Sequence, residues 1–182
     1  GFECADVSVA ANSLAALGRE DVASEAILLD PSAVASLAGE TTTGEGVAGR
    51  RYAPGAPHLL SMVVEGTRED EVTLRLQRGI AACVAAGAVP TGQGFLPPWR
   101  NEPFTPPTML RDSVGRRWVP VHGLVAHSRV AAAIAALDHL FDAHAEMVSE
   151  LDITWSYTGA LVGGETVLIE ANLFWPGASN AL

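Results

Sequence analysis

Titratable and amide side chains interrupt two segments that otherwise have the pattern of apolar β-strands. His122 lies in "RRWVPVHGLVAHSRV" at 116–130, and Glu170 and Asn172 lie in "ETVLIEANLFW" at 165–175. A histidine titrates near neutral pH, and a neighbouring carboxylate can fix its tautomer. His122 and Glu170 are therefore candidates for an acid/base pair. The alternative is that His122 is a structural histidine, hydrogen-bonded within an interface.

Both segments present two unlike faces, because successive side chains of a strand point to opposite sides. One side is aliphatic and comprises Val119, Val121, Gly123, Val125, Val167, Ile169, Ala171, Leu173 and Trp175. The other side, called the mixed face below, comprises Trp118, Pro120, His122, Leu124, Thr166, Leu168, Glu170, Asn172 and Phe174. A solvated face would be richer in Thr, Lys and Glu than in aromatic rings. We therefore expect a ligand, a cofactor or another domain to cover the mixed face. A solvated face remains the alternative.

A third candidate residue, Arg100, lies in the proline-rich stretch "LPPWRNEPF". Its planar guanidinium suits a substrate carboxylate, and an ordinary ion pair in a loop is the alternative. The pairs His122/His127 and His139/His144 are each five residues apart, a spacing that does not place two rings on one face of a helix. No carboxylate flanks these histidines in a metal-binding pattern, so we predict no metal site.

Hydrophobic periodicity predicts the elements that position these residues. Helical spacing is found at 6–17, 67–87 and 128–148, with Thr67 and Ser128 as expected caps, and strand patterns at 26–30, 58–66, 117–125, 151–159 and 165–175. The last two strands form a hairpin around a Gly-Gly turn. This order is typical of an α+β fold, a ferredoxin-like antiparallel sheet with helices packed on one face. The aliphatic strand faces should then pack beneath the helices.

The sequence also indicates a division of the chain at residue 57. Residues 1–57 are expected to form an N-terminal helical and linker segment, and residues 58–182 an α+β domain. Residues 90–115 contain six of the eleven prolines and show no periodicity, which predicts a functional loop or a lid.

Composition excludes several classes of partner. The net charge is −10 and every cation is an arginine, which disfavours nucleic acid and anionic membranes as partners. No apolar run approaches the roughly 20 residues that a membrane span needs. Two cysteines are too few for a disulfide framework or a zinc set, which favours a reduced, cytoplasmic setting. The chain begins with Gly1 and ends in "FWPGASNAL", so we expect a piece of a longer protein.

Four stretches of the chain resemble, in order, the C-terminal cap region of FAD-linked oxidases. They are "HLLSMVVEGTREDEVTLRLQRGIAACVAAGA", "PWR", "RRWVPVHGLVAHSRV" and "VLIEANLFWPG". The family comprises the vanillyl-alcohol oxidase and p-cresol methylhydroxylase flavoproteins, with glycolate- and D-lactate-oxidising branches. "WVPVHG" and the strand ending in "FWP" are the most specific parts of the resemblance.

The resemblance implies that this chain is the cap of a flavoenzyme. FAD would be bound mainly by a separate N-terminal domain of the same protein, and the cap would cover the isoalloxazine ring and shape the substrate site. It also implies catalytic roles for Arg100, His122 and Glu170, and cofactor contacts for Asn172 and Trp118. Several glycolate- and lactate-type relatives carry a His-x-Gly-Asp-Gly-x-x-His signature, which "YTGALVGGETVLIEANLFW" lacks. A metal-dependent 2-hydroxy-acid site is therefore not implied.

Two classes of function follow from these observations. In the first, the chain is the cap of an FAD-dependent oxidoreductase that oxidises a small alcohol, hydroxy acid or phenolic substrate by hydride transfer to flavin, and the cap alone is inactive. In the second, it is a stand-alone module that binds a small ligand on the mixed face or forms a homodimer through it, without catalysis.

Overall fold

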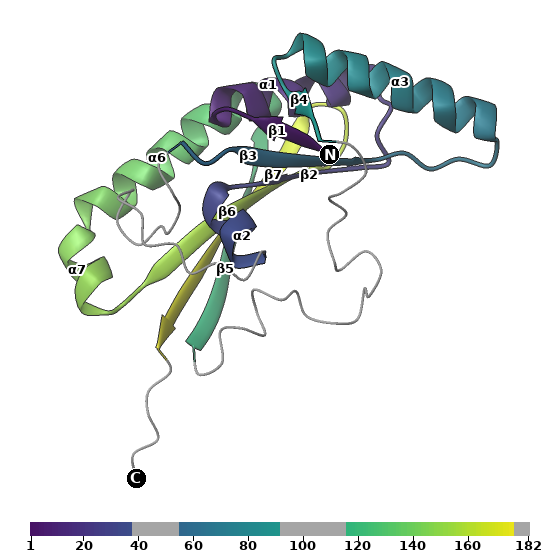
Figure 1. The fold of residues 1–182 in the computed structure, drawn as a ribbon. Coiled ribbons are helices and arrows are strands. Elements are labelled where there is room, and N and C mark those ends of the chain that lie inside the picture. Colours follow the sequence, from purple (N-terminus) through teal and green to yellow (C-terminus); the bar gives the residue numbers. More distant parts are fainter. Residues whose placement is uncertain (38–54, 92–115, 177–182) are drawn as a thin grey trace.

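The computed structural model describes residues 1–37, 55–91 and 116–176, which form an α+β fold around one antiparallel sheet (Figure 1). The strands are β1 (Phe2–Cys4), β2 (Glu25–Leu29), β3 (His58–Val63), β4 (Val89–Pro90), β5 (Arg116–Ala126), β6 (Thr154–Leu161) and β7 (Thr166–Pro176). The helices are α1 (Val7–Glu20), α2 (Pro31–Leu37), α3 (Glu69–Ala85), the short 3-10 helix η1 (His127–Arg129), α6 (Val130–Ala143) and α7 (Ala145–Glu150).

The sheet has seven strands in the order β4-β1-β3-β2-β6-β7-β5, and every neighbouring pair is antiparallel. The predicted α+β class with an antiparallel sheet is therefore confirmed. β2 lies between β3 and β6, so the first 37 residues contribute two strands to the same sheet as the rest. The expected domain boundary at residue 57 stays a prediction.

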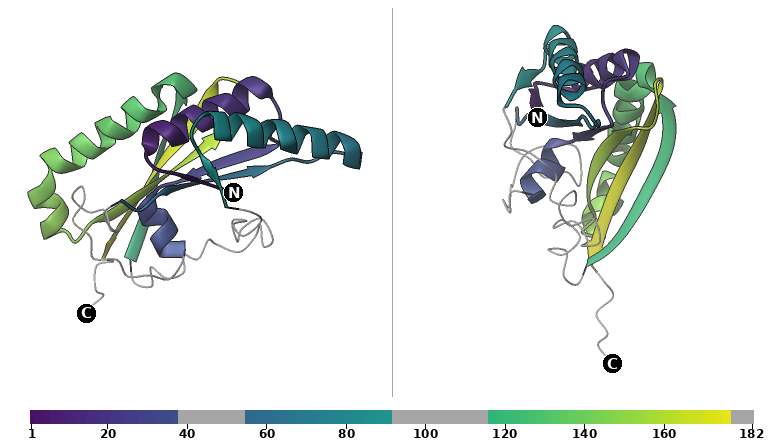
Figure 2. Two further views of the ribbon diagram at one scale, coloured as in Figure 1. Left: turned by 45° about the horizontal axis from the view of Figure 1, so that its top comes forward. Right: turned by 90° about the vertical axis from the view of Figure 1, so that its right-hand side faces the viewer.

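Helices α1, α3 and α6 lie on one side of the sheet, whereas the short helix α2 lies on the other (Figures 1 and 2). α1 begins at an N-cap, Asp6, whose Oδ1 accepts a hydrogen bond of 2.9 Å from Val9 N. α2 begins at Pro31, a residue that suits the first turn of a helix, and the Asp30 carboxylate caps it through Ala33 N at 2.7 Å.

The expected N-caps of α3 and α6, Thr67 and Ser128, are wrong. α3 begins one residue later than predicted, with Arg68 as an N-cap that makes no side-chain capping bond. Instead, three acidic residues in its first turn, Glu69–Glu71, interact favourably with the positive end of the helix dipole. Ser128 lies within η1, and α6 begins after Arg129, again without a side-chain cap.

The core lies between the sheet and helices α1, α3 and α6, on the side of the sheet opposite α2. The apolar side of α6 faces this core, because Val130 and Ile134 are buried and Leu137 and Phe141 pack against the core. The apolar side of α3 is covered only in part. Its C-terminal half packs through Cys83, but Leu76 is 40% exposed because the N-terminal half of α3 extends beyond the strands in Figure 1.

The aliphatic face of β5 departs from expectation. Val125 packs against the core, but Val119 and Val121 are 39% and 57% exposed and do not lie beneath a helix. β5 is the edge strand of the sheet, next to β7, whose Val167, Ile169 and Ala171 are all buried. The helices therefore cover β7 from Val167 to Ala171 and β5 only at its C-terminal end.

Candidate functional site

The mixed face is formed by β5, β7 and β6, on the side of the sheet away from α6. Trp155 of β6 stacks on Phe141 of α6, with ring centroids 4.1 Å apart, so the odd-numbered residues of β6 face the helices. Ser156 therefore points to the opposite side. The ladder pairs Ser156 directly with Asn172 of β7, and Asn172 with Pro120 of β5. The strands thus align the mixed face in three rows, as the alternation predicted for β5 and β7.

His122 and Glu170 are brought together by the β5–β7 register, in which they are direct partners. His122 Nδ1 lies 3.7 Å from Glu170 Oε2, within ion-pair range but too far for a direct hydrogen bond. The His122 side chain is 56% exposed and that of Glu170 is 29% exposed. Both groups are reachable from solvent, so they can exchange a proton with a ligand on this face or with each other through a bridging atom.

Trp118 and Asn172 form a second pair, one step further along the same strands. Trp118 Nε1 donates a hydrogen bond of 2.8 Å to Asn172 Oδ1. Trp118 is 40% exposed, whereas Asn172 is 2% exposed. A buried amide therefore fixes the orientation of an indole ring that is itself partly open on the mixed face.

Hydroxyl groups on β6 belong to the same face, and the sequence reasoning did not include them. Thr154, Ser156 and Thr158 oppose Phe174, Asn172 and Glu170, respectively. The alternation of hydroxyl residues in "TWSYTG" is the signal that could have identified them. Ser156 is 6% exposed, so it forms part of the floor beside Asn172.

Four of the five predicted site residues therefore lie together, as the pairs His122–Glu170 and Trp118–Asn172. Asn172 and Glu170 are two residues apart on β7, and they join the two pairs into one patch. Arg100 lies outside the described residues, as does most of the proline-rich segment 90–115.

Other polar groups are enclosed on the helix side of the sheet and are not part of this patch. His58 Nε2 lies 2.5 Å from the Tyr157 hydroxyl, and both residues are buried. Tyr157 also lies beside Trp155, with ring centroids 6.5 Å apart, so this pair belongs to an aromatic layer of the core.

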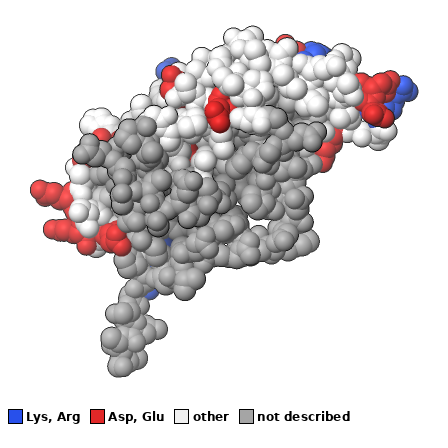
Figure 3. All heavy atoms as spheres, viewed as in Figure 1, with Lys and Arg blue, Asp and Glu red and all other residues white. Residues whose placement is uncertain are grey.

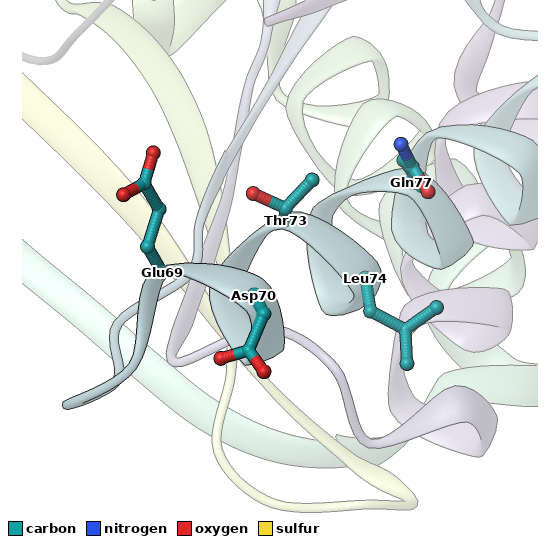
Figure 4. Close-up of a pocket in the computed structure, with 5 residues that line it drawn as sticks. All are labelled: Glu69, Asp70, Thr73, Leu74 and Gln77. Carbon is teal, nitrogen blue, oxygen red and sulfur yellow. The ribbon is translucent and has the colours of Figure 1, made fainter.

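A hollow along the first turns of α3 has no catalytic arrangement. Glu69, Asp70, Thr73, Leu74 and Gln77 line it, and Figure 4 shows them along one helix. Asp70 is paired with Arg68 at 2.7 Å, which lowers the pKa of Asp70 and raises that of Arg68. Both side chains are open to solvent, so this pair is a surface feature.

Charge on the described surface does not form a basic region. Figure 3 shows acidic side chains at both ends of the molecule in this view, and arginines lie beside them at the right-hand end. Examples are Arg68 with Asp70 and Arg78 with Glu20, at 2.7 and 2.6 Å. Within the described residues, no group of three or more His, Cys, Asp or Glu side chains could hold a metal ion. No helix in the described segments is long and apolar enough to cross a membrane.

The described residues fit the ring of a flavin better than its phosphates. The partly exposed indole of Trp118 and the buried amide of Asn172 provide a flat apolar surface and a polar group beside it. A pyrophosphate would need backbone amides at a helix N-terminus or a cluster of basic groups. The first turn of α3 is acidic, and Asp6 occupies the N-terminus of α1. The pair Trp118 and Asn172 thus suits contact with the edge of a planar ring.

Comparison with known proteins identifies the fold. No family model matches the sequence, and neither does any curated protein. Two solved structures of an alkyldihydroxyacetonephosphate synthase, from different crystal forms, are similar to this chain in fold. One has a TM-score of 0.73 at 11% identity and aligns with 98% of this chain. The other has a TM-score of 0.63 at 10% identity and aligns with 97% of it.

The aligned region is a minor part of each synthase. It covers 35% of one synthase chain and 36% of the other, so this chain spans about a third of their length. At such low identity the likeness is one of fold. It extends over nearly the whole of this chain, including the strands that form the mixed face.

Proposed function

We propose that this chain is the cap region of an FAD-dependent enzyme and that its mixed face covers the reacting end of the flavin and the substrate. The observation that carries the proposal is the fold likeness over 98% of this chain to about a third of an alkyldihydroxyacetonephosphate synthase. That synthase is a member of the FAD-linked oxidase family, the family that the sequence resembles. The fold and the sequence motifs thus support the same assignment independently.

The mixed face supports the assignment because its chemistry is incomplete without a partner. A partly exposed, hydrogen-bonded tryptophan and a solvent-reachable His–carboxylate pair lie on the face of the sheet opposite α1, α3 and α6. A domain that holds FAD would cover this face. The same arrangement supports the proposed placement of Trp118 and Asn172 near the cofactor and of His122 and Glu170 near the substrate.

The reaction that we propose is oxidation of a small alcohol, hydroxy acid or phenolic substrate. When bound, FAD supplies the acceptor for the hydride that leaves the substrate carbon. His122 takes the proton of the substrate hydroxyl on a ring nitrogen, and Glu170 stabilises the imidazolium that forms. The substrate loses one hydride and one proton and becomes a carbonyl compound. A substrate carboxylate would be held by Arg100 in the same proposal.

The test is the flavin content of the full-length protein that carries this chain. We expect the purified protein to be yellow, to show the two visible absorbance bands of flavin, and to release FAD on denaturation. A colourless protein from which no flavin is released would reject the proposal. Substrate-dependent bleaching of the flavin bands without oxygen would then separate an oxidoreductase from a flavoenzyme that catalyses no net oxidation.

The second candidate is a module that associates through β5 without catalysis. The observation that favours it is the exposure of Val119, Val121 and Leu124 on an edge strand, at 39%, 57% and 65%. Exposed edge strands can pair with another copy, although Pro120 lacks the backbone N–H that such pairing uses. Light scattering of the chain decides between the two, because self-association through β5 predicts a dimer whose Val121→Asp variant is a monomer.

A further inference from the structure

Asn172 uses only half of its side-chain amide in the contact with Trp118. The indole N–H is a donor without acceptor capacity, so the atom that meets it at 2.8 Å is the amide oxygen. The amide nitrogen keeps two donor hydrogens. It forms no hydrogen bond with another described residue, although Asn172 is 2% exposed.

Ser156 provides a second donor next to it. The β6–β7 ladder places Ser156 directly opposite Asn172, on the same face of the sheet, and Ser156 is 6% exposed. Its hydroxyl also makes no hydrogen bond to any side chain or backbone group in the described segments. Neither the amide nitrogen nor the hydroxyl is among the described buried side-chain atoms that lack a partner, so both keep some contact with the surface. Two adjacent donors can therefore meet one acceptor atom from outside the chain.

The surroundings of these donors are flat and apolar. The Trp118 indole is held in one orientation by its bond to Asn172 and keeps 40% of its surface open. Phe174, the ladder partner of Trp118, is 9% exposed beside it. Pro120, opposite Asn172, adds a compact apolar side chain. Such surfaces pack against the face of a planar ring.

We propose that Asn172, Ser156 and Trp118 form a binding site for a planar ring that bears an acceptor oxygen. The amide nitrogen and the hydroxyl hold the oxygen, and the indole packs against the ring. The site rests on the proposed function and deepens it, because a flavin ring edge and a carbonyl-bearing aromatic substrate share this chemistry. Asn172 is also a positioning residue, since it fixes the indole through its amide oxygen.

The site is tested by titrating the flavin-free protein with riboflavin, with acetophenone, and with ethylbenzene, which matches acetophenone in shape but lacks the oxygen. The signal is the fluorescence difference between the wild type and Trp118→Phe, which isolates Trp118 from the other three tryptophans. We expect saturable quenching by riboflavin or by acetophenone, and much weaker binding of ethylbenzene. Riboflavin alone assigns the site to the cofactor edge, and acetophenone alone assigns it to the substrate. No saturable change with either ligand overturns the proposal, as does equal binding of ethylbenzene and acetophenone.

Two variants test the donors separately. Ser156→Ala removes one hydroxyl, and we expect binding about threefold to tenfold weaker with the emission of free Trp118 unchanged. Asn172→Asp keeps an acceptor for the indole N–H but has no amide donor, so we expect at least a tenfold loss with the indole still fixed. If Asn172→Asp fails to fold, Ser156→Ala decides alone, and unchanged binding in that variant overturns the proposal. If the full-length protein never carries flavin but binds acetophenone, the proposed flavoenzyme function is rejected and the proposed ring-binding site is retained.

Discussion

His122 lies directly opposite Glu170 in the β5–β7 ladder, and 3.7 Å separates His122 Nδ1 from Glu170 Oε2. The histidine is on the edge strand and more than half exposed, whereas the carboxylate is on the neighbouring strand and more deeply placed. A purely structural histidine is usually buried and fully hydrogen-bonded. The open position of His122 therefore favours a role toward a ligand over a role in holding the sheet together.

The first prediction is that His122→Ala lowers turnover far more than it lowers stability. Loss of a general acid or base costs about 10²- to 10⁴-fold in rate. Loss of a side chain that is 56% exposed should change the free energy of unfolding by less than about 1 kcal/mol. Steady-state kinetics of the full-length protein and urea unfolding measure the two quantities. The matched control is His139→Ala, an exposed histidine on α6 that should leave both unchanged. A His122→Ala protein that does not fold would show that His122 is structural.

The second prediction concerns the coupling of His122 to Glu170. Glu170→Gln keeps the shape of the side chain but removes the charge that stabilises an imidazolium. We expect each single variant to lower kcat/KM and the double variant to be little worse than His122→Ala, because Glu170 acts through His122. A double-mutant cycle on kcat/KM measures this coupling. Additive losses would mean that Glu170 contacts the substrate independently of the histidine.

The sequence predicted the mixed face well because strand alternation is a local property. Once 117–125 and 165–175 were recognised as strands, the side of each residue followed from its parity, and the ladder then paired His122 with Glu170. The contribution of β6 was not predicted, because its register against β7 depends on the hairpin turn. Gly163, with a φ of +108°, is at that turn and sets Ser156 opposite Asn172.

The order of strands in the sheet could not be predicted from the same patterns. β2 pairs with β6, although more than a hundred residues separate them, and β5 is displaced to the edge by the β6–β7 hairpin. Such pairings depend on which long-range contacts bury the most apolar surface. The exposure of Val119 and Val121 follows from that edge position and not from their own sequence context.

The third prediction compares two helical glycines. A Cβ at Gly18 of α1 would overlap the backbone carbonyl oxygen of Gly164 in the β6–β7 hairpin, and this oxygen cannot move without the chain. A Cβ at Gly79 of α3 would lie 2.5 Å from Met62 Sδ, which belongs to a flexible side chain. We expect Gly18→Ala to lower the free energy of unfolding by about 1–3 kcal/mol.

Gly79→Ala is the matched control for that variant. Alanine gains about 1 kcal/mol in helix propensity over glycine, which should offset the repacking of Met62 and leave the stability within about 1 kcal/mol of the wild type. Urea denaturation of both variants measures the difference. Equal losses would mean that the hairpin adjusts to α1 as readily as Met62 adjusts to α3.

The fourth prediction is a loss of stability in alkali that arises from two buried thiols. Cys4 and Cys83 are both fully buried, and burial raises the pKa of Cys4 to about 11 and that of Cys83 to about 12, from an ordinary value of 9.0. Above pH 9 the unfolded chain therefore releases protons that the folded chain retains. The free energy of unfolding must fall as the pH rises from about 9 toward the folded pKa values, on the order of 3 kcal/mol for each thiol in full. Below about pH 8 both states keep nearly all of these protons, and the thiols contribute little pH dependence.

Urea unfolding between pH 8 and 10.5 measures this slope, and Cys83→Ser is the control because a serine hydroxyl does not titrate in this range. We expect a clearly shallower fall for the variant than for the wild type, with the difference small at pH 8 and growing as the pH rises through 9. Iodoacetamide provides a second measurement, since only thiolates react and buried thiols of high pKa should resist alkylation at pH 8 until the protein is unfolded. Rapid alkylation of Cys83 in the folded protein, or equal slopes for the two proteins, would show that α3 opens readily from the sheet and exposes the thiol to water.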